Sequence, residues 1–327
     1  MRTTIVFETY WRFAAERHAA YLRRLRGEPA PWSQDPILLA HRFTNAFRAA
    51  DRVSQYLIAN VQYGQHRSQA PDEVFFRTLL FKLFNKVTTW KLLEERLGPL
   101  SWQSTDLAAV QKVLSNAFAR GTRLYSAAYI MPAPGFGAPR KHSNHLALLN
   151  QMMRDGAPGK IASAKSLSDV FELLLSYPGV GPFLAFQYTI DLNYSSILPF
   201  DEDAFVVAGP GALDGISKCF EDTGGRSPEE MIHWMTDNQE REFLHRGIAF
   251  PGLFGRRLQP IDCQNLFCEI SKYARVAHPA VLGVSNRTRI KQRYKASCEP
   301  LARPCFPPKW GLSVPLAAAP RPASLFE

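Results

Sequence analysis

The sequence predicts an all-α protein with two lobes and an extended C-terminal tail. Apolar residues recur at helical spacing through the first half of the chain and again from Ser166 onward. No series of alternating apolar and polar residues indicates strands, and the last thirty residues are rich in proline. With 327 residues, of which 46% are hydrophobic and 21% charged, the chain is long enough to bury a sizeable core.

The longest expected helix covers residues 37–58, where Phe43, Phe47, Ala50, Ser54 and Leu57 share one stripe. Further helices are predicted over 74–86, 90–97, 107–120, 228–244 and 262–275. Gly98 and Gly121 are plausible stop signals, and Ser166 with Asp169 forms a capping pair ahead of another helix.

The stretch 131–141 is rich in proline and glycine and is the best internal boundary. We therefore expect an N-terminal helical lobe over 1–160, a second lobe over 161–298, and a proline-rich tail over 299–327, either packed on the surface or partly loose.

Lysine and arginine outnumber the acidic residues by 39 to 29, which gives a net charge of +10. This excess favours a polyanionic partner, although a basic but inert surface has the same composition. The densest basic run is 286–295, where Arg287, Arg289 and Lys291 are expected to contact DNA phosphates. A solvated face is an equally good account of that run.

Five cysteines occur without a Cys-x-x-Cys pair, so neither a disulfide framework nor a zinc ribbon is indicated. We expect buried free thiols, no metal and no cofactor. Charge interrupts the first residues too early for a secretory signal, and no apolar run is long enough to span a bilayer. A cytoplasmic monomer without membrane contact is the expectation.

The segment Pro178–Gly181 joins two apolar helical runs and predicts a helix, a glycine hairpin and a second helix. Glycine allows a sharp turn with positive φ, which leaves backbone N–H groups free at the start of the second helix. Gly179, Val180 and Gly181 are therefore predicted to bind a DNA phosphate. The alternative is a tight turn with only a structural role.

Together with Leu198-Pro199-Phe200-Asp201, this hairpin resembles the helix-hairpin-helix DNA glycosylase superfamily. In that superfamily an aspartate at this separation begins the next helix and is catalytic, which implies that Asp201 is the catalytic residue here. Phe183 stands where bifunctional members carry a lysine, which implies a monofunctional glycosylase without lyase activity. The cysteine spacing departs from that of the relatives that hold an iron–sulfur cluster, so no cluster is expected.

A carboxylate beneath the sugar would stabilise the positive charge that develops as the N-glycosidic bond breaks, and would orient the attacking water. The base would first be flipped into a pocket in the cleft between the lobes. The alternative for Asp201 is that it caps the helix it begins; Asp203 is a second candidate for catalysis.

A broader resemblance links the chain to the α-glutamyl/putrescinyl thymine pyrophosphorylase family, which is associated with hypermodified bases of phage DNA. Asn85, Lys86 and Tyr129 lie in the matching segments and, with Phe183, are predicted to line the base pocket. Tyr129 is equally well explained as a core residue. The remaining matching segments are 42–52, 208–212 and 262–269.

The two resemblances together imply a monofunctional DNA glycosylase that excises a glucosylated hydroxymethyl pyrimidine from double-stranded phage DNA, as an anti-phage defence. Two alternatives stay open. One is a base-hypermodification enzyme of the transferase or pyrophosphorylase type that acts on hydroxymethyl-pyrimidine in DNA. The other is a non-catalytic module that binds modified DNA.

Overall fold

The computed structural model describes residues 1–128, 131–295, 297 and 299–315. Two compact units share the chain. The first combines Met1–Asp51 with Val206–Pro304 and the described residues after Trp310, and the second combines Arg52–Phe205 with Cys305–Trp310. Residues 161–205 thus belong with the helices that precede them, so the boundary expected at residue 160 lies inside one unit.

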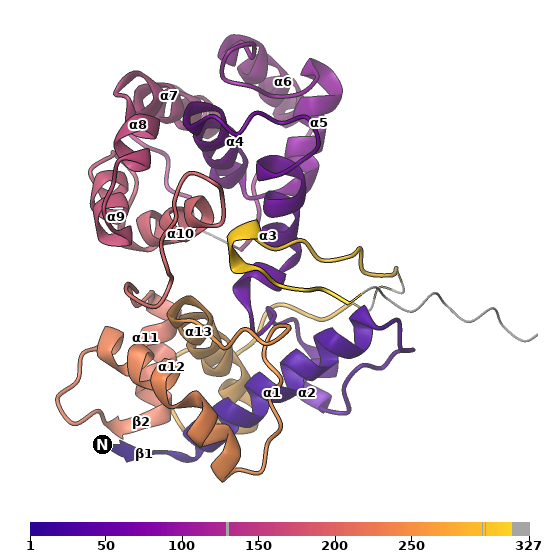
Figure 1. Cartoon of the computed structure of the whole chain (residues 1–327), viewed down its shortest axis with the longest axis vertical. Coiled ribbons are helices and arrows are strands. Elements are labelled where there is room, and N and C mark those ends of the chain that lie inside the picture. Colours follow the sequence, from indigo (N-terminus) through magenta and orange to yellow (C-terminus); the bar gives the residue numbers. More distant parts are fainter. Residues whose placement is uncertain (129–130, 296, 298, 316–327) are drawn as a thin grey trace, which may run out of the picture. The chain divides into compact units, whose positions relative to one another are not determined.

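The first unit is helical apart from one small antiparallel sheet, formed by β1 (Arg2–Thr3) and β2 (Phe220–Asp222) (Figure 1). Its helices are α1 (Ile5–Leu25), α2 (Pro36–Ala40), η1 (Arg48–Ala50), α11 (Pro210–Cys219), α12 (Pro228–His245) and α13 (Pro260–Ala277). Aromatic rings fill its core, where Tyr10 and Trp11 of α1 pack against Phe267 and Phe243 with ring centroids 5.0 Å apart in both cases.

Helix α11 crosses α13 at very short range because two glycines face it. A Cβ atom at Gly215 would lie 2.0 Å from the Phe267 carbonyl oxygen, and one at Gly211 would lie 2.7 Å from Cys268 Sγ. These residues come from two of the segments that carry the second resemblance, 208–212 and 262–269, and from the turn of helix that follows the first. In this structure those segments meet as packing partners within the core.

The second unit contains α3 (Arg52–Tyr56), the π-helical η2 (Leu57–Gln62), α4 (Pro71–Phe84), α5 (Val87–Leu97), α6 (Leu107–Ala119), α7 (Lys141–Arg154), α8 (Ala157–Ala162), α9 (Leu167–Leu175), α10 (Pro182–Asn193) and the 3-10 turn η3 (Pro308–Trp310). Helix α4 is central and is buried from Glu73 to Phe84. It carries a buried cation, Lys82, whose Nζ lies 3.1 Å from Asp191 Oδ2 on α10.

The mostly helical fold is confirmed, as are the helices expected near 74–86, 90–97, 107–120, 228–244 and 262–275. Ser166 caps α9 by accepting the Asp169 amide, also as expected. No helix in the described part of the chain is both long and apolar enough to cross a membrane. The helix-hairpin-helix glycosylase architecture is not confirmed.

The single helix predicted over 37–58 is wrong, because residues 41–47 form an irregular connection. Polar side chains outcompete the helical hydrogen bonds there. Asp51 accepts the Asn45 amide at 2.8 Å, Asn45 Nδ2 donates to the Ala50 carbonyl at 2.7 Å, and Glu269 of α13 accepts the Thr44 amide at 3.1 Å. Phe43 and Phe47 are buried as expected, but from an irregular backbone.

The described part of the proline-rich tail has no helix or strand apart from the short turn η3. Lys309 of this turn donates to Asn193 Oδ1 at 2.9 Å and to the Leu198 carbonyl at 2.7 Å, and the Trp310 ring packs against Tyr194 at 5.6 Å. This part of the tail is therefore anchored at the end of α10.

Candidate nucleic-acid interface

The glycine hairpin has the predicted local geometry: α9 ends at Leu175, α10 begins at Pro182, and Gly179 in the turn has φ +76°. The amides of Gly179 and Gly181 have no acceptor among the described residues, and both glycines are exposed. The Val180 amide instead donates to the Tyr177 carbonyl at 3.2 Å, and the Val180 side chain is buried. Two of the three predicted amides are thus free to meet an anion, and phosphate binding there stays a prediction.

The loop 131–140, which precedes α7 in the chain, packs against this hairpin. A Cβ atom at Gly179 would lie 3.0 Å from Pro134 Cβ, so the hairpin packs directly on the middle of the loop. At the loop's end, Asn144 Oδ1 accepts the Ala138 amide at 3.1 Å, and Asn144 Nδ2 donates to the Ala138 carbonyl at 2.7 Å. The loop therefore contacts the hairpin at its middle and is hydrogen-bonded to α7 at its end.

Asp201 does not begin a helix. Residues 201–209 are irregular, and the next helix is α11, which starts at Pro210. Asp201 is exposed, and its Oδ1 accepts the Asp203 amide over a long 3.4 Å, which makes it a turn residue. The preceding carbonyl, of Phe200, accepts Asn193 Nδ2 at the C-terminal end of α10. The hairpin amides lie at the other end of that twelve-residue helix, about 18 Å along its axis.

The predicted base-pocket residues do not share one environment. Asn85 is buried in the left-handed conformation that ends α4, and its Oδ1 accepts Lys82 Nζ at 2.8 Å. Lys86 donates to the Arg123 carbonyl. Phe183 lies half-buried in the first turn of α10, and Tyr129 lies outside the described residues. Their role in reading a base stays a prediction.

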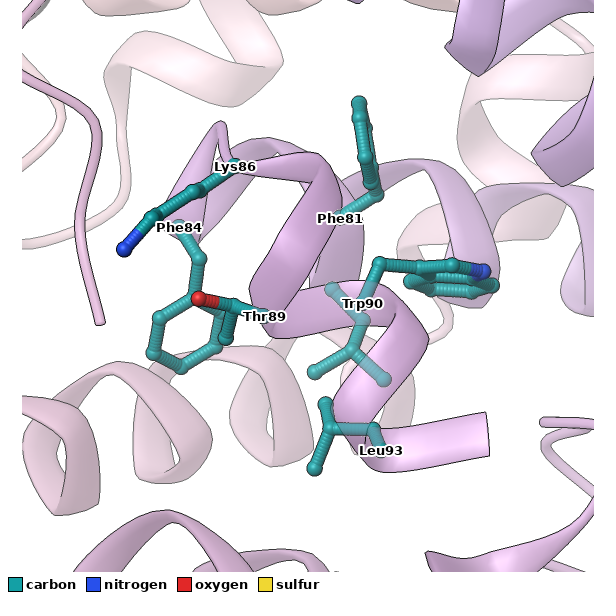
Figure 2. Close-up of a pocket in the computed structure, with 7 residues that line it drawn as sticks. Phe81, Phe84, Lys86, Thr89, Trp90 and Leu93 are labelled. Carbon is teal, nitrogen blue, oxygen red and sulfur yellow. The ribbon is translucent and has the colours of Figure 1, made fainter. Parts of the chain in front are cut away.

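Figure 2 shows the corner between α4 and α5 and the side chains that line a shallow hollow there, which has no room for a bound molecule. Apolar side chains line it except for Lys86 and Thr89, which extend to the same side of the corner. Thr89 Oγ1 is already used, since it donates to the Leu124 carbonyl at 2.7 Å. A hydroxymethylated base needs more polar partners than this hollow supplies.

Several polar groups meet at the start of α7, of which only Lys141 belongs to the stretch 131–141 that was predicted as a loop. His145 Nδ1 accepts the Tyr125 hydroxyl at 2.7 Å, His142 Nε2 lies 2.9 Å from Ser115 Oγ, and Lys141 Nζ lies 4.4 Å from the centre of the Tyr125 ring. Burial lowers the pKa of His145 to about 4, with help from the nearby charge of Lys141. The available signal was two histidines three residues apart directly after Arg140-Lys141, a spacing that puts both on one face of a helix.

The basic run of the first unit is irregular and exposed at Arg287, Arg289 and Lys291, as a phosphate-binding segment would be. The start of this run is held in place by the buried carboxylate of Asp214, which accepts hydrogen bonds from the Ser285 amide at 2.7 Å and from the Ser271 hydroxyl. These two hydrogen bonds contribute to an Asp214 pKa below its usual range, against the opposing effect of burial. Contact of this run with DNA stays a prediction.

A family model described as 5-hmdU DNA kinase, helical domain, matches residues 4–283. The chain belongs to this family. A curated member, the 5-hmdU DNA kinase of Bacillus phage SP10, is 23% identical over 286 residues, which cover 82% of this chain. The same match covers only 45% of that kinase, so the chain spans less than half the length of this relative. No solved structure matches.

Membership of the 5-hmdU DNA kinase helical-domain family overturns the predicted glycosylase. The relative is named as a kinase, which transfers a phosphoryl group, and not as a hydrolase of N-glycosidic bonds. The error has a physical origin: a glycine turn ahead of a helix can bind any phosphate, so the motif carries no information about which bond is broken. The broader expectation of a protein family concerned with modified pyrimidines in DNA agrees with both comparisons.

Proposed function

We propose that this chain takes part in modifying DNA that carries 5-hydroxymethylated pyrimidines, with a phosphoryl group transferred to the hydroxymethyl oxygen of the base. The family match over residues 4–283 is the observation that carries the proposal. Exposed cations and free turn amides in the second unit supply the groups that would hold the DNA backbone during such a reaction.

The transfer itself would join the hydroxymethyl oxygen to the terminal phosphorus of a nucleoside triphosphate, and a nucleoside diphosphate would leave. The hydroxyl proton would pass to a general base. The chain has no Gly-x-x-x-x-Gly-Lys-Ser/Thr segment for the triphosphate. Within the described ranges, no three His, Cys, Asp or Glu side chains gather as a metal ion would require. We therefore assign no residue to the donor or to a metal.

A second candidate function is a module that binds hydroxymethylated DNA without modifying it. The observation in its favour is that the match covers less than half of the phage kinase. In this case recognition of the base would reside in this chain, and the chemistry would reside elsewhere.

One experiment separates the candidates. The purified protein is incubated with ATP, Mg²⁺ and duplexes that differ in a single base, which is 5-hydroxymethyluracil, 5-hydroxymethylcytosine or thymine, and the nucleosides are analysed by mass spectrometry. A phosphorylated hydroxymethyl nucleoside supports the modification enzyme. Tighter binding of the hydroxymethylated duplexes with every nucleoside unchanged supports the binding module. Equal binding of all three duplexes without product contradicts both.

A further inference from the structure

Four basic side chains of the second unit form what we call the α5–α7 cationic patch: Lys86, Arg123, Arg140 and Lys141. Lys86 precedes α5, Arg123 follows α6, and Arg140 and Lys141 begin α7. Lys86 is partly exposed and the other three are exposed. Among the residues that the structure describes, none of the four is paired with a carboxylate.

Direct contacts connect the members of the patch. Lys86 Nζ donates to the Arg123 carbonyl, two residues before Tyr125. The centre of the Tyr125 ring lies 5.0 Å from that of Phe84, two residues before Lys86. The Lys141 amino group lies over the Tyr125 ring, 4.4 Å from its centre. Arg140 covers a second ring, with its guanidinium 5.0 Å from the centre of Phe118, which is 46% exposed. Two of the four cations therefore rest on aromatic rings.

Three of the four cations, all except Arg123, stand at the electrostatically unfavourable end of a helix. The N-cap residues of α5 and α7 are Lys86 and Arg140, and neither helix has a side chain that caps its first amides. Most helix N-termini are positive and favour Asp, Ser or Thr. Two helices of the same unit follow that rule, α6 with Asp106 and α9 with Ser166. The patch thus adds the helix-end charge to four unpaired side-chain charges.

Neighbouring positive charges repel one another across the patch. After burial, the next cause that lowers the pKa of Lys86 is the charge of Arg123, and the next cause that lowers the pKa of His142 is the charge of Arg140. No acidic group offsets either shift. A polyanion with regularly spaced charges would relieve this repulsion.

We propose that the α5–α7 cationic patch binds the phosphate backbone of DNA, with the glycine hairpin as the neighbouring contact across the loop 131–140. The inference rests on the proposed function for its choice of DNA as the polyanion. It concerns backbone contacts that hold any DNA sequence, separate from recognition of the modified base.

The test compares two variants that lose the same charge. The patch variant replaces Lys86, Arg123, Arg140 and Lys141 by Gln, and the control variant replaces Lys112, Arg154, Lys160 and Lys165 by Gln. The control residues are exposed cations of the same unit that are likewise without a carboxylate partner among the described residues. Binding of a labelled, unmodified DNA duplex is measured by fluorescence anisotropy over a range of salt concentrations, after circular dichroism has shown that both variants are folded.

We expect the patch variant to lose about tenfold or more in affinity, and its plot of log K against log salt to flatten by up to about 0.9 for each phosphate contact removed. The control variant should bind like the parent protein. Equal losses in both variants would show that only net charge matters and would overturn the inference, as would a patch variant that binds normally. Preference of the parent protein for an RNA duplex over the DNA duplex would also overturn it.

Failure of this inference can be distinguished from failure of the proposed function. A parent protein that binds DNA through the patch but neither modifies hydroxymethylated bases nor prefers DNA that contains them would retain this inference and lose the proposed function. A parent protein that modifies them while the patch variant binds unmodified DNA normally would do the reverse.

Discussion

His145 and Pro132 are joined by a hydrogen bond of 2.9 Å that fixes the protonation of a buried imidazole. The Pro132 carbonyl only accepts, so the His145 Nε2 carries a proton, and Nδ1 is left to accept the Tyr125 hydroxyl at 2.7 Å. This neutral ring ties the loop 131–140 and Tyr125 to α7. It supports the α5–α7 cationic patch from inside without adding to its charge.

Acidification should weaken the protein through this histidine. Burial lowers the pKa of His145 in the folded state from 6.5 to about 4, so the unfolded chain takes up the proton first. The stability that the neutral ring contributes is present above pH 6.5 and is lost as pH falls from 6.5 through 4. The loss is on the order of 2–3 kcal/mol.

Urea denaturation at a series of pH values measures this loss. The variant His145→Gln keeps a polar group of similar reach but does not titrate, so its stability should change less between pH 6.5 and 4. His18, whose pKa burial also lowers to about 4, adds slope of the same sign in both proteins, and Asp51, whose pKa burial raises to about 6, adds slope of the opposite sign. Parallel curves for the parent protein and the variant would contradict the assignment.

The glycine turn should tolerate alanine at one position and not at the other. Gly179 has φ +76°, and a Cβ there would lie 3.0 Å from Pro134 Cβ, so Gly179→Ala is expected to cost about 1–3 kcal/mol. Gly181 has φ −81°, and a Cβ there meets nothing within 4 Å, so Gly181→Ala should change stability by less than about 0.5 kcal/mol. Thermal unfolding of the two variants makes the comparison, and equal effects would refute it.

How much of this structure was open to prediction differs from region to region. Regular apolar spacing located α4, α6, α12 and α13, because these helices bury much of their surface, and the Ser166 cap located α9. The segment 41–47 was misread since its apolar spacing is helical while its backbone is held by Glu269, more than two hundred residues away. No local pattern reports such a contact.

In the candidate site, too, local features could be predicted from the sequence and long-range ones could not. The turn around Gly179 was predictable because its conformation is local to a few residues. The α5–α7 cationic patch was not, since its members come from the α4–α5 connection, the α6–α7 connection and the first residue of α7, whose proximity depends on how α4 through α7 pack. The chemistry was misassigned because the glycine hairpin, with an aspartate at the expected separation, matched a glycosylase motif, while the helix that Asp201 should begin is absent from the structure at that position.

Removing one partner of the buried ion pair between Lys82 and Asp191 should destabilise the protein strongly, whereas replacing both partners together should destabilise it little. Their side chains are at most 2% exposed and Nζ lies 3.1 Å from Oδ2. Lys82→Met leaves a buried carboxylate without this cation and is expected to cost about 3–5 kcal/mol. Adding Asp191→Leu should recover most of that loss. Chemical denaturation of the single and double variants measures both values, and a double variant no more stable than the single would show that the pair is not coupled.

The crossing of α11 on α13 predicts opposite effects for one type of substitution at two helical sites. Gly215→Ala places a methyl group 2.0 Å from the Phe267 carbonyl oxygen and 2.6 Å from its carbon. Backbone atoms cannot rotate away, so the helices must separate, at an expected cost of about 3 kcal/mol or more. Gly159→Ala in α8 meets nothing within 4 Å and should stabilise by about 0.5–1 kcal/mol, because alanine loses less backbone entropy than glycine on folding.

Differential scanning calorimetry of both variants tests the prediction. A Gly215→Ala protein that melts with the parent would mean that α11 and α13 lie farther apart than described. A stabilised Gly159→Ala protein beside a destabilised Gly215→Ala protein would show that the same methyl group is rejected by close packing at one site and accepted by open space at the other.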